Sequence, residues 1–348
     1  MASLSRYGIM KVFIIQADGK DGKNCILKSC HMLFDGNLMI RYRKNKEIDK
    51  QKWDNCIQNA VNRRSYAFSW FLDIVSPGWD GLEMNDYEAV FPLPQNSKFG
   101  IRYLYQPYFA QQLGIFSQEH LTSQLVEEFL LAIPPRFSYI HIHLNSMNKI
   151  DPGKFQIVPR LNHELDLIPS YDVIFNGYNQ NTRRNLRKAL DQNLRISRKV
   201  DPDELIALFK ANYGRNEVAL KYRQYNTLRL LMDYCLKNTF SLTLGAYLPD
   251  NTLCAGIFFL QDKERSIYHF AASDNNAREN GAMFMLIDIF IKEHAGQLLI
   301  LDFEGSIDNN VARFYKGFGA KETGFSEILI NRLPGKIGMM VDVFKKLR

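Results

Sequence analysis

Hydrophobic residues in the first part of the chain recur with two periods, one typical of strands and one typical of helices. Read in order, these patterns predict a strand at 39–43, a helix at 48–61, strands at 87–94 and 100–109, a helix at 117–133 and a strand at 139–144. The second of these helices ends where Pro134 and Pro135 remove backbone donors. Strands and helices in alternation favour a layered α/β domain.

A second set of elements follows after residue 166. The predicted order is a helix at 178–194, a helix at 201–213, a further helix, a strand hairpin at 241–260, a strand at 266–273, a helix at 277–294, a strand at 297–303, a helix at 309–319 and a strand at 324–333. Asp201 is a predicted N-cap, with Pro202 at the first helical position. The second part is therefore also of the α/β type.

The two parts are joined by DPGKFQIVPRLNHELDLIPS, residues 151–170, which contains three prolines. We interpret this stretch as a segment that crosses between two units rather than as part of a core. A length of 348 residues also favours two domains. The prediction is an α/β protein (α+β mixed sheet) with domains at 39–165 and 166–348, after a poorly defined N-terminal extension at 1–38.

Composition narrows the class of protein. Hydrophobic residues make up 46% and charged residues 23%, which excludes disordered, collagen-like and mucin-like chains. Five scattered cysteines form no CxxC pair and suit no closed disulfide framework. We find no signal peptide and no apolar run of the roughly 20 residues that a membrane helix needs. The expected location is the cytoplasm, without a transmembrane segment.

The net charge of +7 is concentrated in one segment. Between Arg183 and Lys199 there are seven basic residues and one acidic residue, a balance of 7 − 1 = +6. The helix there stacks Arg183 above Arg187 and Arg184 above Lys188. A solvated helix face is the ordinary interpretation. The functional one is a surface for a phosphate-bearing acceptor or for tRNA.

Two short motifs in the second part resemble the GNAT acyltransferase fold. Arg278 and Gly281 match the first two defined positions of the Arg/Gln-x-x-Gly-x-Gly/Ala loop of that family, whereas Met283 occupies the third. Ala312 to Gly319 resembles the A-x-x-Phe-Tyr-x-x-x-Gly helix of GNAT enzymes. Together with NTRRNLRKAL, the wider pattern resembles the Fem aminoacyltransferases of peptidoglycan bridge formation. That resemblance implies two GNAT-like domains in tandem, with the donor site in the second domain.

The resemblance implies a donor site after the strand at 266–273. The free N–H groups and positive end of the following helix suit the pyrophosphate of an acyl-CoA such as acetyl-CoA, and Gly281 permits close backbone approach. The candidate cofactor-binding residues are Ala271, Ala272, Ser273, Arg278, Asn280, Gly281 and Ala282. The alternative is an ordinary capped turn, because SDNN is good capping chemistry. A gap between 266–273 and 298–303 would admit the pantetheine arm of the donor.

Catalysis requires a base for the amine and an acid for the leaving thiolate. In LDFEGS, Asp302 and Glu304 share one face of the strand end, and Glu304 is the candidate base. Asp302 and His269 are weaker candidates. Tyr315 occupies the position of the general acid in the GNAT helix, although its spacing also suits a core tyrosine.

His141 and His143 alternate along one predicted strand, and the sequence shows no third metal ligand, so we predict no metal. The predicted function is an N-acyltransferase that moves an acyl group from acyl-CoA to an amine of a small molecule or a cell-wall precursor. An aminoacyl-tRNA donor that modifies a peptidoglycan precursor is the first alternative. A non-catalytic binding protein of the same fold, suggested by Met283, is the second. The acceptor is left open.

Overall fold

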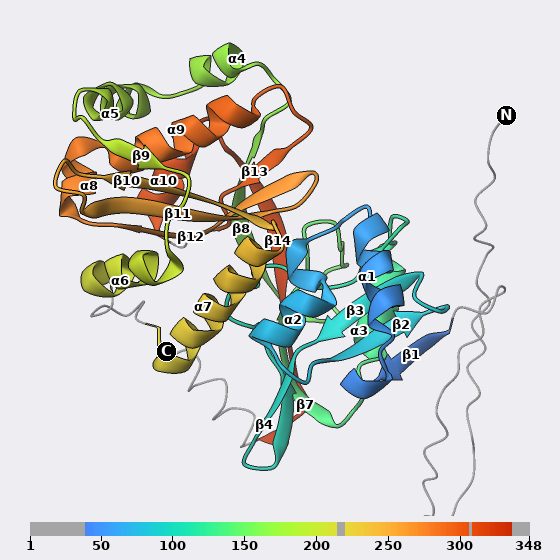
Figure 1. The fold of residues 1–348 in the computed structure, drawn as a ribbon. Helices are drawn as coiled ribbons and strands as arrows, with labels where there is room; N and C mark the ends of the chain where they lie inside the picture. Colours follow the sequence, from blue (N-terminus) through green and yellow to red (C-terminus); the bar gives the residue numbers. More distant parts are fainter. Residues whose placement is uncertain (1–38, 214–219, 306–307, 336–348) are drawn as a thin grey trace, which may run out of the picture.

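The computed structural model describes residues 39–213, 220–305 and 308–335. The predicted N-terminal extension at 1–38 lies outside the described residues. We refer to 39–165 as the first half of the molecule and to 166–335 as the second half. Figure 1 shows the two halves side by side, joined by long strands that run from one into the other.

The described strands form two sheets. The small sheet has the order β1 (Ile40–Arg43), β2 (Asp80–Met84), β3 (Ala89–Leu93) and β6 (Phe116–Ser117). The large, mixed sheet has the order β4 (Gln95–Lys98), β5 (Ile101–Leu104), β7 (Phe137–His143), β14 (Lys321–Asn331), β8 (Gln156–Asp166), β13 (Ile300–Asp302), β12 (Arg265–Ser273), β11 (Leu253–Gln261), β10 (Ser241–Tyr247) and β9 (Arg195–Ser197). Strands of both halves therefore belong to one hydrogen-bonded sheet.

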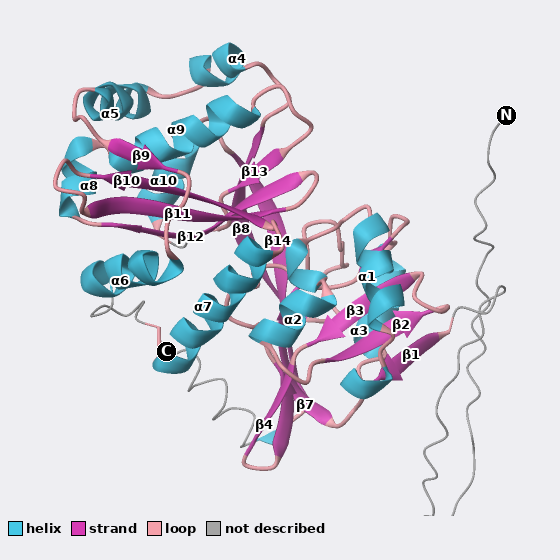
Figure 2. Ribbon diagram, viewed as in Figure 1, coloured by secondary structure: helices cyan, strands magenta, loops and turns pink. Residues whose placement is uncertain are grey.

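Helices cover the sheets from several sides (Figure 2). The α-helices of the described residues are α1 (Lys50–Asn59), α2 (Ser69–Val75), α3 (Ser123–Leu131), α4 (Tyr171–Asn176), α5 (Gln180–Leu190), α6 (Pro202–Tyr213), α7 (Tyr222–Lys237), α8 (Asn275–Asn280), α9 (Ala282–His294) and α10 (Asn309–Lys316). Short 3-10 turns lie at Asn45–Glu47 and Ser65–Ala67. In the second half, α6 and α9 pack on the sheet, and α5 packs on α9 as a further layer.

The helix ends follow from local capping chemistry. The Asp49 side chain accepts hydrogen bonds from the first N–H groups of α1, and Thr122 does the same for α3. Because Thr122 is the cap, α3 begins six residues later than the predicted start at 117. Asp201 and Pro202 open α6 as predicted, with the Asp203 N–H donating to Asp201 Oδ1 at 2.7 Å. The predicted helix at 277–294 is split at Gly281, which has a φ of +78°.

The prediction for residues 151–170 is wrong. Most of this stretch forms β8, which is paired with β14 along its length and lies inside the large sheet. Pro159 is tolerated because this part of β8 has a paired strand on one side only, since β13 pairs with 164–166 alone. A proline that faces the open side of a strand removes no ladder hydrogen bond.

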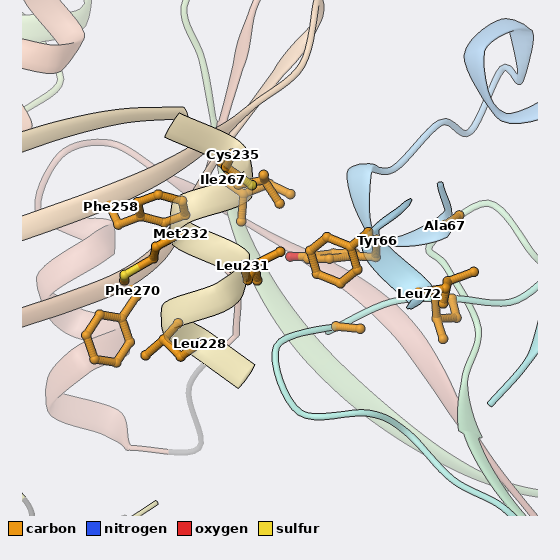
Figure 3. Packing of buried hydrophobic residues seen from close by; sticks show 14 of the residues in the cluster. Tyr66, Ala67, Leu72, Leu228, Leu231, Met232, Cys235, Phe258, Ile267 and Phe270 are labelled. Carbon is orange, nitrogen blue, oxygen red and sulfur yellow. The ribbon is translucent and has the colours of Figure 1, made fainter. Parts of the chain in front are cut away.

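One hydrophobic core crosses the boundary between the halves. Tyr66 and Leu72 of the first half and Leu231 of α7 belong to the same buried cluster. Figure 3 shows the Tyr66 side chain pointing toward Leu231 of α7. Trp70 stacks on Tyr234 of α7, with ring centroids 5.0 Å apart. Each large apolar side chain that is fully buried adds about 1.5–3 kcal/mol to the free energy that stabilises the folded state. The two halves therefore stabilise each other and hold any site between them in fixed geometry.

Candidate active site between the two halves

The strands β12 and β13 form a fork. They pair in parallel only where Arg265, Ser266 and Ile267 face Ile300, Leu301 and Asp302. Beyond Ile267, β12 continues to Ser273 beside β11 and has no further paired residue of β13. Pairing between the two strands therefore ends within the region where the sequence predicts a gap for a donor.

A β-bulge accompanies the fork. Phe258 of β11 faces Phe270, whereas the next residue, Phe259, faces Tyr268, so that His269 is the extra residue. Two hydrogen bonds at the ends of the β11–β12 pair, from Asp274 N to Cys254 O and from Asp262 N to Arg265 O, show which residues of β12 direct their backbone groups toward β11. Because the direction alternates along an antiparallel pair, the backbone groups of Tyr268, Ala271 and Ser273 point away from β11, toward the open side of the fork.

Glu304 lies just beyond β13 in a strained backbone conformation, with a φ of +59°. Its N–H donates to Asp302 Oδ1 at 2.9 Å, and the Tyr66 hydroxyl donates to its Oε1. The next residue, Gly305, passes so close to β8 that an added Cβ would lie 2.0 Å from the Leu161 carbonyl oxygen. Only glycine fits there, so the backbone that carries Glu304 is fixed by Asp302 on one side and by the close approach of Gly305 to β8 on the other.

Buried charges support this strand end. Arg265 Nη1 donates to Asp302 Oδ2 at 2.6 Å and to Glu164 Oε1 at 2.8 Å. Burial disfavours the charge of Arg265, but Asp302 and Glu164 outweigh this effect and raise its pKa. Arg64 of the first half lies 4.0 Å from Glu164, and burial, together with the charge of Arg265, lowers its pKa to about 10. Asp302, a weaker candidate base, is therefore already engaged by Arg265 in a buried ion-pair network and is not free to accept a proton from a substrate.

His269 lies next to the Glu304 carboxylate. Its Nδ1 is 3.6 Å from Glu304 Oε1, and neither ring nitrogen makes a hydrogen bond to a described residue. The rings of Tyr66, Phe71 and Phe109 surround it, with centroids 6.1–6.3 Å away. An imidazole with unpaired nitrogens in an apolar cage is unusual. It adds a second titratable group within reach of the carboxylate.

Tyr315 stands at the mouth of the same fork. Its ring stacks on Phe303 at 4.7 Å between centroids and lies 5.9 Å from the ring of Tyr268. Burial, and then the negative charge of Glu304, raises the pKa of Tyr315. The phenol therefore keeps its proton at neutral pH. The charge of Glu304 therefore reaches Tyr315, but the two side chains have different neighbours: Phe303 and Tyr268 for Tyr315, Tyr66 and His269 for Glu304.

The candidate donor residues lie along the open side of the fork and in the helices after it. Ala271, Ala272 and Ser273 form the end of β12, and Arg278 is exposed on α8, with Nη2 3.4 Å from the hydroxyl of Tyr213. Asp274 caps α8 by accepting from the Ala277 N–H at 2.8 Å, as the capped-turn alternative expects.

The loop that follows is covered. The Ala282 N–H donates to the buried Asn280 side chain at 2.9 Å. Gly281 is buried against α5, and an added Cβ would lie 2.5 Å from the Asn185 carbonyl oxygen. The space beside the Gly281 backbone, where the sequence predicts a phosphate, is therefore filled by α5.

The basic residues of α5 divide into two groups. Arg183 is half-buried, donates to the Phe175 and Asn176 carbonyls and lies over the Phe175 ring. The side chains of Arg184, Arg187 and Lys188 are exposed. A hollow of about 460 Å³ lies between α4, α5 and α9, away from the fork. A second hollow, of about 690 Å³, lies in the first half.

Sequence reasoning missed the contribution of the first half to this site. Tyr66 and Arg64 lie in a stretch whose pattern marks only a short turn, and Tyr66 is 238 residues from Glu304 along the chain. No local spacing could have linked them. Among the described residues, no helix combines the length and the apolar character that a membrane span requires.

The comparisons with known proteins identify the fold. No protein-family model and no curated protein matches the sequence. The crystal structure of FemX is similar over 80% of this chain and 96% of FemX, with a TM-score of 0.58 and 14% identity. A conserved protein of unknown function from Bacteroides thetaiotaomicron gives a TM-score of 0.55 at 11% identity, over 84% of this chain and 100% of that protein. L-PGS from Bacillus licheniformis gives 0.53 at 10% identity, over 85% of this chain and 96% of that chain.

The chain therefore has the mixed α/β fold of FemX, and the GNAT-type, Fem-like fold expected from the sequence is confirmed. At these identities the likeness is one of fold. The chemistry must be argued from the site itself.

Proposed function

We propose that the protein is an acyltransferase. It transfers an acyl group to the amine of an acceptor that binds beside Glu304. The observation that carries this proposal is the fork between β12 and β13, with Glu304 and Tyr315 at its mouth and unpaired backbone groups along one side. Acyl transfer needs a base, a donor for the oxyanion and an acid for the leaving group. The fork provides a candidate for each.

Glu304 is the proposed base. An acceptor amine must lose a proton as its nitrogen attacks the acyl carbon, and the carboxylate accepts that proton directly or through a water. The Tyr66 hydroxyl keeps the carboxylate in place. Burial, and then the charges of Glu304 and Asp302, raises the pKa of Tyr66 well above its ordinary value, so this phenol remains a donor. His269 Nδ1 lies 3.6 Å from Glu304 Oε1, beyond hydrogen-bond distance, so the carboxylate acts as the base without it.

The backbone supplies the oxyanion donor. The N–H groups of Tyr268, Ala271 and Ser273 face the open side of β12, where a donor carbonyl would lie. Fixed backbone donors stabilise a tetrahedral oxyanion without reorganisation, and one such donor contributes about 10²- to 10³-fold in rate.

Tyr315 is the proposed acid for the leaving group. As the bond from the acyl carbon to the leaving atom breaks, the phenol donates a hydrogen bond to the developing anion. With ordinary pKa values of about 10 and 8.5, full proton transfer to a thiolate costs roughly 2 kcal/mol. The raised pKa of Tyr315 increases that cost. Hydrogen-bond donation is therefore the main effect.

Substitution of Tyr315 by phenylalanine tests this role. We expect turnover to fall by about 10- to 100-fold, because a hydrogen bond to a charged group contributes about 1.5–3 kcal/mol. The phenol makes no hydrogen bond that the fold requires among the described contacts, so the melting temperature should change little. Phe314→Tyr, on the same helix, is the matched control. Unchanged turnover in Tyr315→Phe would remove the acid assignment.

The preferred donor is an acyl-CoA. Its pantetheine arm would lie in the fork beside Ala271, Ala272 and Ser273, and its phosphates near Arg278. Release of free thiol from acetyl-CoA in the presence of a panel of amines tests this proposal. No thiol release with any amine, and no protection of the protein by CoA against unfolding, would overturn the choice of donor.

One observation favours a second donor, aminoacyl-tRNA. The N–H groups at Gly281 and Ala282, where a CoA pyrophosphate was expected, are covered by Asn280 and α5. The outer face of α5, in contrast, exposes Arg184, Arg187 and Lys188. These residues would contact the tRNA backbone, while the same fork accepts the aminoacyl ester.

Salt dependence of tRNA binding distinguishes the two donors. Each phosphate contact contributes about 0.7–0.9 to the slope of log affinity against log salt. We expect the triple change of Arg184, Arg187 and Lys188 to glutamine to reduce that slope by about two to three. A triple glutamine change at the exposed Lys98, Lys149 and Lys237 is the matched control. Equal slopes in both variants would argue against tRNA contact at α5. If neither donor supports transfer, the protein is a binding module.

A further inference from the structure

Two histidines and a glutamate meet on one face of the large sheet. His141 and His143 lie on β7, and Glu327 of β14 is the direct cross-strand partner of His143. Glu327 Oε1 is 2.7 Å from His141 Nε2, and its Oε2 is 3.8 Å from His143 Nε2. One ligand atom from each residue lies within 4.8 Å of the others. The third group that the sequence did not reveal is thus supplied by a strand 186 residues away from His141.

Neighbouring groups orient two of the three side chains. His143 Nδ1 is 2.9 Å from the Gln111 carbonyl oxygen, which only accepts, so Nδ1 carries the proton and Nε2 has a lone pair. Arg160 Nε is 2.6 Å from Glu327 Oε2 and leaves Oε1 turned toward His141. Metal-binding histidines and carboxylates are commonly held by such outer contacts.

Proton release and solvent access also bear on metal binding. In the hydrogen bond between His141 Nε2 and Glu327 Oε1 the imidazole donates, so this nitrogen must release its proton when a metal ion binds. Glu327 is buried, whereas the side chains of His141 and His143 are 26% and 21% exposed. One side of the cluster therefore remains open to solvent.

We propose that His141 Nε2, His143 Nε2 and Glu327 Oε1 form a binding site for a divalent transition-metal ion of the Zn²⁺ type. Two nitrogens and one oxygen from three side chains, with an open fourth position, match the donor set of such ions. Ligand atoms about 2.0–2.1 Å from a tetrahedral zinc lie roughly 3.3 Å apart, so small side-chain movements suffice. The positive charge of Arg160 opposes the ion and is offset by Glu327.

The site lies where the halves share a sheet, since β14 belongs to the second half and β7 to the first. Gln111, whose carbonyl holds His143, also has its side-chain Nε2 3.2 Å from the position of a Cβ on Gly305. The metal would thus fix a segment that borders the Glu304 loop. This inference is independent of the proposed acyltransferase function.

Metal titration of the full-length protein, after treatment with a chelator, tests the site. We expect one Zn²⁺ bound per chain, and visible absorption typical of histidine and carboxylate ligands when Co²⁺ replaces it. His143→Ala and Glu327→Gln should each weaken Zn²⁺ binding at least about tenfold, as does loss of even an outer contact in known sites. His120→Ala, at an exposed histidine of the first half, should leave affinity unchanged.

A second measurement separates loss of the site from loss of the fold. Zn²⁺ should raise the melting temperature of the unmodified protein, because an ion that binds only the folded state stabilises it. The variants should melt cooperatively but show no such increase. No saturable binding of one Zn²⁺ per chain, or binding that His143→Ala and Glu327→Gln leave unchanged, would overturn the proposal and leave an ion-pair network only.

Discussion

Replacement of Glu304 by glutamine should lower the rate of acyl transfer by about 10²- to 10⁴-fold, the usual contribution of a positioned general base. The amide cannot accept the proton of the attacking amine, but its oxygen can still accept the hydrogen bond from Tyr66. The φ of +59° and the bond from the Glu304 N–H to Asp302 involve the backbone and survive the change. The effect should therefore fall on kcat rather than on folding.

The measurement is the initial rate of thiol or tRNA release with the amine that supports turnover. Glu264→Gln, an exposed glutamate in the turn before β12, is the matched control and should keep full activity. If Glu304→Gln retains more than a tenth of the activity while melting normally, the base lies elsewhere and His269 becomes the next candidate.

Substitution of Arg265 by methionine should lower the free energy of unfolding by about 3–5 kcal/mol. The change leaves Asp302, which is almost fully buried, as an uncompensated charge. Urea unfolding followed by circular dichroism measures this loss. Arg229→Met is the matched control, because its partners Asp203 and Asp233 are exposed and such pairs contribute about 0–1 kcal/mol.

A double substitution tests the reason for the loss. Adding Asp302→Asn to Arg265→Met removes the stranded charge, and we expect it to recover part of the lost stability. Recovery will be incomplete, because Glu164 Oε1 also accepts a hydrogen bond from Arg265 and still lacks it in the double variant. A single Arg265→Met change that costs less than about 1 kcal/mol would contradict the assignment of this network as a buried support of the site.

Much of the fold could be predicted because hydrophobic periodicity is a local property. The helices α1, α3 and α9, and the hairpin of β10 and β11, follow from residues within the same short stretch. The strand β8 could not be predicted in this way, because the stretch around it, 151–170, has three prolines and many polar residues and resembles a linker. What makes it a strand is its pairing with β14, far away along the chain.

Local sequence patterns could likewise identify only some residues of the candidate site. Glu304 and Tyr315 could be named because a strand end and a helix motif lie close together in the sequence, and their catalytic roles stay predictions. Tyr66, Arg64 and Glu327 could not, since each meets its partners only through the tertiary fold. The role of Gly281 depends on α5, whose packing against it no motif encodes.

The position of β14 affects how this protein is made. β14 lies between β7 and β8, so these two strands leave the ribosome with facing edges that have no partner. Unpaired strand edges are templates for association with other chains. The edges are filled only after residue 331 has been synthesised. A chain truncated before β14 should therefore aggregate rather than fold.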